Sequence, residues 1–228
     1  MLTDMVVDFP GVTVTHSDAA LVLRSPHPLH ILSSAVVGGG FLRAGTILNW
    51  HVRKGYDHPH PAADLVAFAH RCGLPTPLVG MMTAALLQHA RAATYQADGV
   101  TATAVVTAGL SNASTPGLSP PAVLVPGTIN MILLLDAALL PAAMVNAVIT
   151  ATEVKTQVVL AQGACTPEGH PATGTSTDAM VIACTGRGPD HPYAGPATPV
   201  GWLIGRSVRT ALTEALRASG YGEGTYGR

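Results

Sequence analysis

The sequence predicts a single α/β or α+β domain over residues 1–228, sandwich-like, with long helices packed on a sheet. Two observations lead to this fold class. The first half is rich in short apolar segments separated by Pro and Gly, and the second half contains two long helical patterns. A chain of 228 residues is also long enough to bury a substantial core. The Ser-, Pro- and Gly-rich stretch 113–127 is expected to be a loop between the two halves.

Strands are expected in the first half wherever short apolar or alternating segments lie between turn-forming residues. These segments are 12–16, 19–24, 30–37, 42–52, 77–84 and 101–108. A helix is predicted from Pro61 to Cys72, because proline suits the first helical position and Gly73 suits the position after the last turn. The segment 85–97 is compatible with either a helix or a strand.

The second half begins with a continuous apolar run at 128–135, bounded by Gly127 and Asp136, which is typical of a fully buried strand. Two helices and one further strand are expected after it, at 141–161, 199–218 and 178–184. Thr198 is placed to cap the last helix, since a threonine hydroxyl at that position accepts a bond from an otherwise unpaired amide.

Composition narrows the classes of partner. The net charge is −1 and no basic patch is present, which argues against nucleic acid. The longest apolar run, 131–145, is interrupted by Asp136 and Pro141, so no segment reaches the roughly 20 residues that a membrane span needs. No secretory signal is visible and three cysteines are scattered without a CxxC pair, which favours a cytoplasmic protein with free thiols.

Charged residues make up only 11% of the chain, compared with about 25% in typical soluble domains. The chain also contains 24 Gly and 18 Pro. This composition is compatible with tight packing and a homo-oligomer interface, or with a coding bias towards Ala, Gly and Pro.

Three polar clusters lie beside glycines at predicted strand ends, where main-chain amides and side chains can converge on a ligand. They are "TAGLSNA" (107–113), "PGTINM" (126–131) and "ATGTSTDAM" (172–180). Each also has a simple structural interpretation, because Ser, Thr, Asn and Gly are ordinary turn residues. A threonine directly after a glycine at a strand start, as at Gly127-Thr128, is how N-terminal-nucleophile hydrolases place their catalytic residue.

Other features are weaker. The predicted helix 141–161 places Asn146, Thr150, Glu153 and Gln157 on one face, which is either solvated or functional. His58 and His60 form an HxH pair that suits zinc or cobalt, but no third ligand has convincing spacing and we expect no metal site. The glycine run in "VVGGGF" (36–41) lacks a P-loop or dinucleotide fingerprint and is better explained as a tight bend.

Read in order along the chain, nine blocks resemble the adenosylcobinamide amidohydrolase family (CbiZ). They are "SSAVVGGGF" (33–41), "TILNWHV" (46–52), "GYDHPHPA" (55–62), "VGMMTAA" (79–85), "TAGLSNA" (107–113), "GTINMILLLDA" (127–137), "ITATEVKT" (149–156), "ATGTSTDAMVIA" (172–183) and "YAGPATPVGWLIG" (193–205). The resemblance extends over most of residues 30–208, and the last five blocks are its most specific part.

The resemblance implies hydrolysis of the amide that joins aminopropanol to the corrin ring of adenosylcobinamide, with release of adenosylcobyric acid and 1-amino-2-propanol. The corrinoid is then a small-molecule substrate used in salvage or remodelling, and no cofactor is expected. A mostly neutral, glycine-rich pocket suits such a ligand. The residues expected to bind it are Gly38, Gly39, Gly40, Asn49, His51, His58, Ser111, Asn130, Thr175, Ser176 and Tyr193.

A second resemblance bears on mechanism. Three of the blocks are similar to segments of the ornithine acetyltransferases and DmpA-type aminopeptidases, and a relation to that fold is one possibility. The analogy makes Thr128 the nucleophile, and it predicts either self-cleavage at Gly127-Thr128 or another base, with Glu153 as the next candidate. The residues that it assigns to oxyanion binding and to orientation are Thr107, Gly109, Asn112, Ser176 and Asp178.

Two other functions remain open from the sequence. One is a corrinoid-binding or carrier protein without turnover, although the DxHxxG signature of lower-ligand cobalamin binders is absent. The other is an acyl-transferring or peptide-cleaving relative of the ornithine acetyltransferases, whose known pattern has no place for the glycine- and histidine-containing blocks at 33–62.

Overall fold

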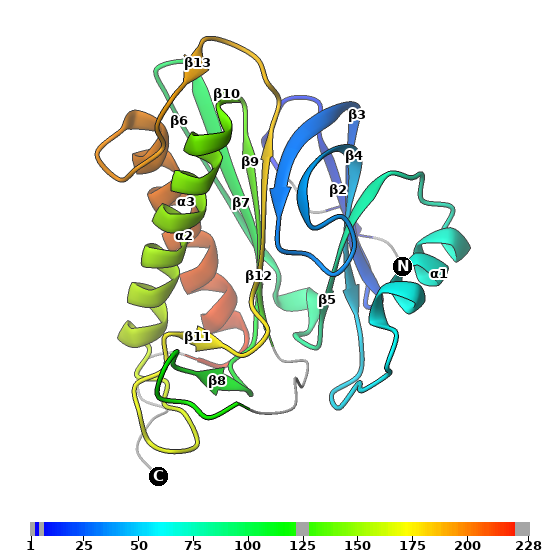
Figure 1. Cartoon of the computed structure of the whole chain (residues 1–228), viewed down its shortest axis with the longest axis vertical. Helices are drawn as coiled ribbons and strands as arrows, with labels where there is room; N and C mark the ends of the chain where they lie inside the picture. Colours follow the sequence, from blue (N-terminus) through cyan, green and yellow to red (C-terminus); the bar gives the residue numbers. More distant parts are fainter. Residues whose placement is uncertain (1–2, 5–6, 122–127, 222–228) are drawn as a thin grey trace.

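The structure is a computed structural model that describes residues 3–4, 7–121 and 128–221. Its main element is a nine-stranded mixed sheet that combines strands from both halves of the chain (Figure 1). Its strands are β1 (Thr3–Asp4), β2 (Thr13–His16), β3 (Ala20–Ser33), β4 (Gly40–His51), β5 (Leu78–Thr83), β6 (Arg91–Ala97), β7 (Val100–Ala108), β9 (Ile129–Leu135) and β12 (Ala179–Cys184). The order is β1-β2-β3-β12-β9-β7-β6, with β4 on the other side of β3 and β5 beyond β4.

Within the described ranges, the remaining elements are three helices, a short 3-10 turn and two small strand pairs. The helices are α1 (Pro61–Arg71), α2 (Pro141–Ala161) and α3 (Pro199–Ala218), and the 3-10 turn is η1 (Leu87–His89). The small pairs are β8 (Ala113–Ser114) with β11 (Gly174–Thr175), and β10 (Ala138–Leu139) with β13 (Asp190–His191). None of the helices in the described ranges is long and apolar enough to cross a membrane.

The sheet folds over so that its two parts face each other across an apolar core. Side chains of β3, β4 and β5, such as Ile31, Ile47 and Met81, pack there with Ile132 of β9 and Val181 of β12. Helices α2 and α3 cover the outer face of β6, β7, β9 and β12, and α1 covers the outer face of β4 and β5 (Figure 1). The result is a helix–sheet–sheet–helix sandwich, which confirms the predicted mixed fold class.

The long strand β3 corrects the expectation of two separate strands at 19–24 and 30–37. It pairs with β4 along most of its length, with a register shift between Arg24 and Leu29. On its other edge, β2 pairs as far as Arg24 and β12 pairs from His30 onward. Pro26 and Pro28 fall in the gap between these partners, where a missing amide breaks no ladder bond.

The other helices and strands agree with the sequence to within a few residues. The ambiguous segment 85–97 is the turn η1 followed by strand β6. Thr198 caps α3 as predicted, because its Oγ accepts a hydrogen bond of 3.0 Å from the amide of Gly201. Most of the predicted loop 113–127 is irregular apart from β8, and residues 122–127 lie outside the described ranges.

Candidate active site

A buried polar network lies where β4, β7 and β9 come together. The Asn49 Nδ2 donates to Thr107 Oγ1 (2.9 Å), and the Asn130 Nδ2 donates to Asn49 Oδ1 (2.8 Å) and to the Met82 carbonyl (2.9 Å). Asn49 and Asn130 are 2% and 1% exposed. Four residues that the sequence singled out in three separate blocks are therefore joined in one chain of hydrogen bonds, because buried amides must find partners: Asn49, Thr107, Thr128 and Asn130.

Thr128 occupies one end of this network, directly before β9. Its hydroxyl lies 2.6 Å from the Thr177 carbonyl and 3.2 Å from Asn130 Oδ1, and the residue is 1% exposed. Its own carbonyl accepts a bond of 3.1 Å from the amide of Gly109. The Gly109 amide, which the sequence analogy assigned to an oxyanion, is thus already used to hold the main chain of Thr128. The bond before Thr128 involves residue 127, which lies outside the described residues.

Asp178 anchors the start of β9 beside Thr128. Its Oδ1 accepts from the amide of Ile129 (3.1 Å) and from the Thr175 hydroxyl (2.5 Å). Its Oδ2 accepts from the amide of Thr175 (3.2 Å) and lies 2.5 Å from Lys155 Nζ of α2. The Asp178 and Lys155 side chains are 16% and 13% exposed. A carboxylate that sequence analysis treated as an orienting group therefore orients the main chain next to Thr128.

Asn112 connects the turn after β7 to the turn before β12. Its Nδ2 donates to Ser176 Oγ (2.9 Å) and to Thr177 Oγ1 (3.2 Å), and the amide of Ser176 donates to its main-chain carbonyl. The small β8–β11 pair joins the same two turns through their main chains. These contacts bring the predicted clusters at 107–113 and 172–180 together around Thr128.

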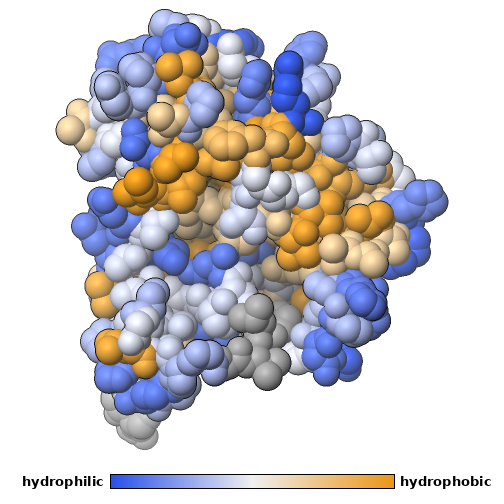
Figure 2. Space-filling view, viewed as in Figure 1, coloured by the Kyte–Doolittle hydropathy of each residue, from blue (hydrophilic) through white to orange (hydrophobic). Residues whose placement is uncertain are grey.

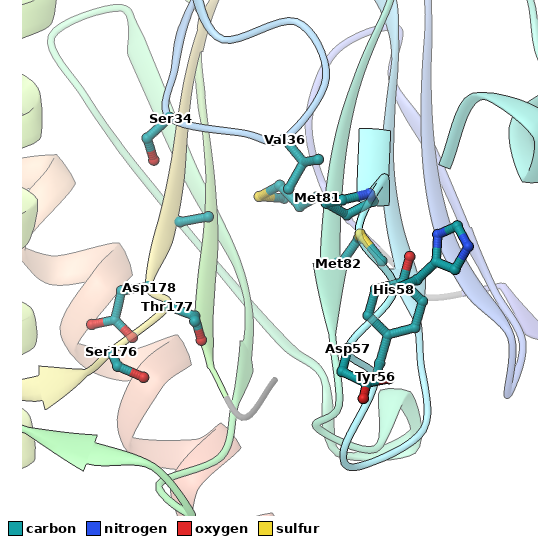
Figure 3. A pocket seen from close by; sticks show the side chains of 12 residues that line it. Ser34, Val36, Tyr56, Asp57, His58, Met81, Met82, Ser176, Thr177 and Asp178 are labelled. Carbon is teal, nitrogen blue, oxygen red and sulfur yellow. The ribbon is translucent and has the colours of Figure 1, made fainter. Parts of the chain in front are cut away.

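A pocket of about 470 Å³ opens beside this cluster, between the two parts of the folded sheet. One wall carries Ser34, Ser176, Thr177 and Asp178, and the opposite wall carries an apolar and aromatic set (Figure 3). That set includes Val36, Met81, Met82 and Tyr56. The surface view shows a hydrophobic band across this face of the molecule with polar surface below it (Figure 2). The pocket therefore offers hydroxyl and carboxylate groups on one side and an apolar surface on the other, as expected of a site for a large, partly apolar ligand.

The loop before α1 completes the rim. Tyr56 donates through its hydroxyl to Asp64 Oδ2 (2.5 Å), and His58 Nδ1 lies 2.9 Å from the same oxygen. Burial, followed by the hydrogen bond and charge of Asp64, raises the pKa of Tyr56 to about 12. His58 lines the pocket, and its ring centroid is 6.1 Å from that of His60. In the part of the chain that the structure describes, no three His, Cys, Asp or Glu side chains gather as a metal site would require.

Several residues expected at the site lie elsewhere. Tyr193 is 68% exposed in the segment between β13 and α3 and does not line the pocket. Ser111 lines a separate small cavity together with Gly109, His89 and Lys54. His51, at the end of β4, is half-buried and is not among the lining residues.

The glycine run 38–40 forms a tight bend rather than a pocket wall. Gly38 has a φ of +71°, and a Cβ there would lie 2.7 Å from the Leu78 carbonyl oxygen. Gly39 is similarly close to the main chain of Ala35, and Gly40 has a φ of +84°. Gly38 allows the β3–β4 connection to pack against β5, and the same connection supplies Ser34 and Val36 to the pocket.

Glu153 is not placed to act as a base for Thr128, and this expectation is corrected. It is exposed on α2, in a groove shared with Trp202, Arg206 and Arg209 of α3. Two residues along the helix is about 200° of rotation, so the side chain on the Asp178 side of α2 is Lys155. The face of α2 that lies towards the site therefore presents the ammonium group of Lys155 and not the carboxylate of Glu153.

The sequence analysis did not single out Lys155, Thr177, Tyr56, Met81 or Met82 as site residues. The sequence does contain one sign that Lys155 is unusual. It is one of two lysines in the whole chain, and it lies in a helix that is otherwise nearly uncharged. The methionines and Tyr56 gave no such signal, since apolar residues at strand and loop positions are usually part of the core.

Comparisons with known proteins assign the family. A model of the adenosylcobinamide amidohydrolases (CbiZ) matches residues 8–221. A Methanosarcina mazei protein named adenosylcobinamide amidohydrolase is 31% identical over 196 residues, which cover 82% of this chain and 90% of that protein. A Halobacterium salinarum protein of the same name is 36% identical over 178 residues, which cover 75% and 69%.

Among solved structures, the PH0078 protein from Pyrococcus horikoshii OT3 matches with a TM-score of 0.49 and 11% identity, covering 95% of this chain and 83% of that one. The family match spans the network, the pocket and all three helices. The chain therefore belongs to the adenosylcobinamide amidohydrolase family.

Proposed function

We propose that this protein hydrolyses the amide that joins aminopropanol to the corrin ring of adenosylcobinamide, releasing adenosylcobyric acid and 1-amino-2-propanol. The observation that carries the proposal is the family match over residues 8–221, supported by two relatives that bear the name of this activity. The role that follows is salvage of cobinamide or remodelling of a cobamide in the cytoplasm. The corrinoid enters as substrate, and no separate cofactor takes part.

The pocket suits this substrate in size and chemistry. A volume of about 470 Å³ holds the amide-bearing side chain, while the macrocycle rests against Val36 and Met82 across the mouth. Thioether and aliphatic groups adapt to an irregular apolar ring edge. The scissile amide then lies towards the wall that carries Ser176 and Thr177, which is the wall nearest Thr128.

In the proposed reaction, the Thr128 oxygen attacks the amide carbon, the C–N bond breaks, and aminopropanol leaves with the proton from the hydroxyl. Water then hydrolyses the resulting ester, restores the hydroxyl and leaves a carboxylate on the corrinoid. The Thr107 hydroxyl accepts from Asn49 and retains its own proton to donate to the developing oxyanion, while Asn112 Nδ2 donates to Ser176 and Thr177 and so orients that wall of the site. For the attack, the Thr128 hydroxyl must exchange its bond with the Thr177 carbonyl for contact with the substrate.

The partners of this hydroxyl narrow the choice of base. Among the described residues, its hydrogen-bond acceptors are a main-chain carbonyl and the amide oxygen of Asn130, and neither accepts a proton at neutral pH. A free amine on Thr128, created by cleavage of the preceding peptide bond, would supply a base within the same residue. An intact-mass measurement of the purified protein tests this part of the mechanism by showing whether the chain is split before Thr128.

The function is tested by incubating the protein with adenosylcobinamide and detecting adenosylcobyric acid and aminopropanol by mass spectrometry. Thr128→Ala should lower kcat by about 10²-fold or more, because a nucleophile and its oxyanion contacts contribute that much. Thr156→Ala, on the half-buried side of α2, is the matched control and should retain activity. Tight corrinoid binding without product from the wild-type protein would instead identify a carrier, and full activity of Thr128→Ala would exclude Thr128 as nucleophile.

A further inference from the structure

Lys155 and Asp178 form an ion pair in a protein that has few charges. Lys155 is one of two lysines in the sequence, and its side chain is 13% exposed, against 16% for Asp178. Withdrawing an ion from water costs several kcal/mol, so a nearly buried pair is poor evidence for added stability. The location of this pair, beside the main chain of Thr128, indicates a different use.

The carboxylate of Asp178 joins three segments. Besides Lys155 of α2, it binds the hydroxyl and amide of Thr175 in the turn before β12, and the amide of Ile129 at the start of β9. Ile129 follows Thr128 directly in the chain. A displacement of Asp178 would therefore move the main chain that carries the Thr128 hydroxyl.

Gly174 makes room for the pair. A Cβ at this position would overlap Asp178 Oδ2 and would lie 2.6 Å from Lys155 Nζ and 3.3 Å from its Cε. Gly174 is buried in the short strand β11, and no turn conformation with positive φ accounts for the glycine. The glycine at position 174 is therefore a second, independent sign that the fold keeps space for direct contact between the Lys155 ammonium and the Asp178 carboxylate.

We propose that Lys155 is a positioning residue of the active site, which fixes the Thr128 hydroxyl through Asp178 and the Ile129 amide. The proposal rests on the hydrolase function proposed above. Without the cation, Asp178 is a nearly buried and uncompensated charge, and it would leave its place or bring in water. The Ile129 amide would then lose its acceptor, and a shift of the nucleophile of about 1 Å is enough to lower the rate by about 10²-fold.

The first test separates catalysis from binding. Lys155→Met keeps the apolar stem and removes the charge, and it should lower kcat by about 10²-fold but raise the Kd for adenosylcobinamide much less, because Asp178 is the only member of the ion pair that lines the pocket and the apolar wall with Val36 and Met82 stays in place. Lys155→Ala should regain activity when ethylammonium is added, and not with tetramethylammonium at equal concentration. Arg217→Met, which removes an exposed cation from α3, is the control.

The second test keeps both charges. Gly174→Ala should separate the pair and reproduce the loss in kcat, whereas Gly195→Ala, with nothing within 4 Å of its added Cβ, should not. Hydrogen exchange at the Ile129 amide should become faster in Lys155→Met and in Gly174→Ala, and this readout does not depend on turnover.

The outcomes distinguish the two proposals. An inactive wild-type protein would contradict the hydrolase function, while unchanged Ile129 exchange in both variants would contradict the positioning role. In an active protein, full kcat in Lys155→Met would also overturn it. The positioning role would also be contradicted if Lys155→Ala lost kcat and corrinoid binding in parallel and ethylammonium did not restore them, since that pattern indicates a general structural defect.

Discussion

Replacing Asn130 by alanine tests the buried polar network most sharply. The Asn130 side chain donates to Asn49 Oδ1 (2.8 Å) and to the Met82 carbonyl (2.9 Å), and it accepts from the Thr128 hydroxyl (3.2 Å). The residue is 1% exposed, so water does not replace these bonds without local opening. Thr128 retains the Thr177 carbonyl as an acceptor, but Asn49 Oδ1 and the Met82 carbonyl each lose a donor.

The expected loss can be estimated from these contacts. A buried polar group that loses its partner costs about 1–3 kcal/mol, so two such groups should lower the free energy of unfolding by about 2–6 kcal/mol. Domains of this kind have total stabilities of about 5–15 kcal/mol, which makes the change a large one. Asn49→Ala removes the same hydrogen bond between Asn49 and Asn130 as Asn130→Ala does. The double variant should therefore lower the free energy of unfolding by at least about 0.5 kcal/mol less than the sum of the two single variants.

Urea denaturation with linear extrapolation measures these differences, with Asn146→Ala as the control. Asn146 is half-buried on α2 and its side chain is remote from the network, so its removal should change the free energy of unfolding by no more than about 0.5 kcal/mol. A cost below about 1 kcal/mol for Asn130→Ala, or strict additivity with Asn49→Ala, would refute the reasoning.

Three further outcomes are expected. Because burial and Asp64 raise the pKa of Tyr56 to about 12, the folded state holds this proton more tightly than the unfolded chain. The resulting stability is complete below about pH 10 and is lost as the pH rises towards 12, and Asp64→Asn should lower the pKa in an ultraviolet titration. Thr198→Ala should lower the free energy of unfolding by about 1 kcal/mol, since the Gly201 amide loses the hydroxyl oxygen that accepts its hydrogen bond. Glu153→Gln should leave kcat/KM unchanged; a large loss would contradict its placement away from Thr128.

Much of the fold is predictable from local patterns. The helices begin at prolines and end near glycines, and the continuous apolar run at 129–135 becomes the central strand β9. These features depend on neighbouring residues, so the sequence contains the information directly. The continuity of β3 cannot be predicted in this way, because it depends on distant partners. Pro26 and Pro28 are tolerated in this strand only because they lie between the part that pairs with β2 and the part that pairs with β12.

The site is less predictable, because it depends on contacts between distant segments. Asn49 and Asn130 are 81 residues apart and meet only when the sheet folds over. Sequence spacing identified the polar helix face that contains Glu153, but it did not reveal which side of α2 faces the sheet. The partner of Asp178 is Lys155, and this follows from the docking of α2 against β11 and β12 rather than from any local motif.

The central claim, hydrolysis of a corrinoid amide, is tested most directly by running the reaction in water enriched in heavy oxygen. We predict that adenosylcobinamide is converted to adenosylcobyric acid with one heavy oxygen atom in its new carboxylate, together with unlabelled 1-amino-2-propanol. Recovery of intact adenosylcobinamide, or transfer of the acyl group to an added amine without incorporation of label, would contradict the account.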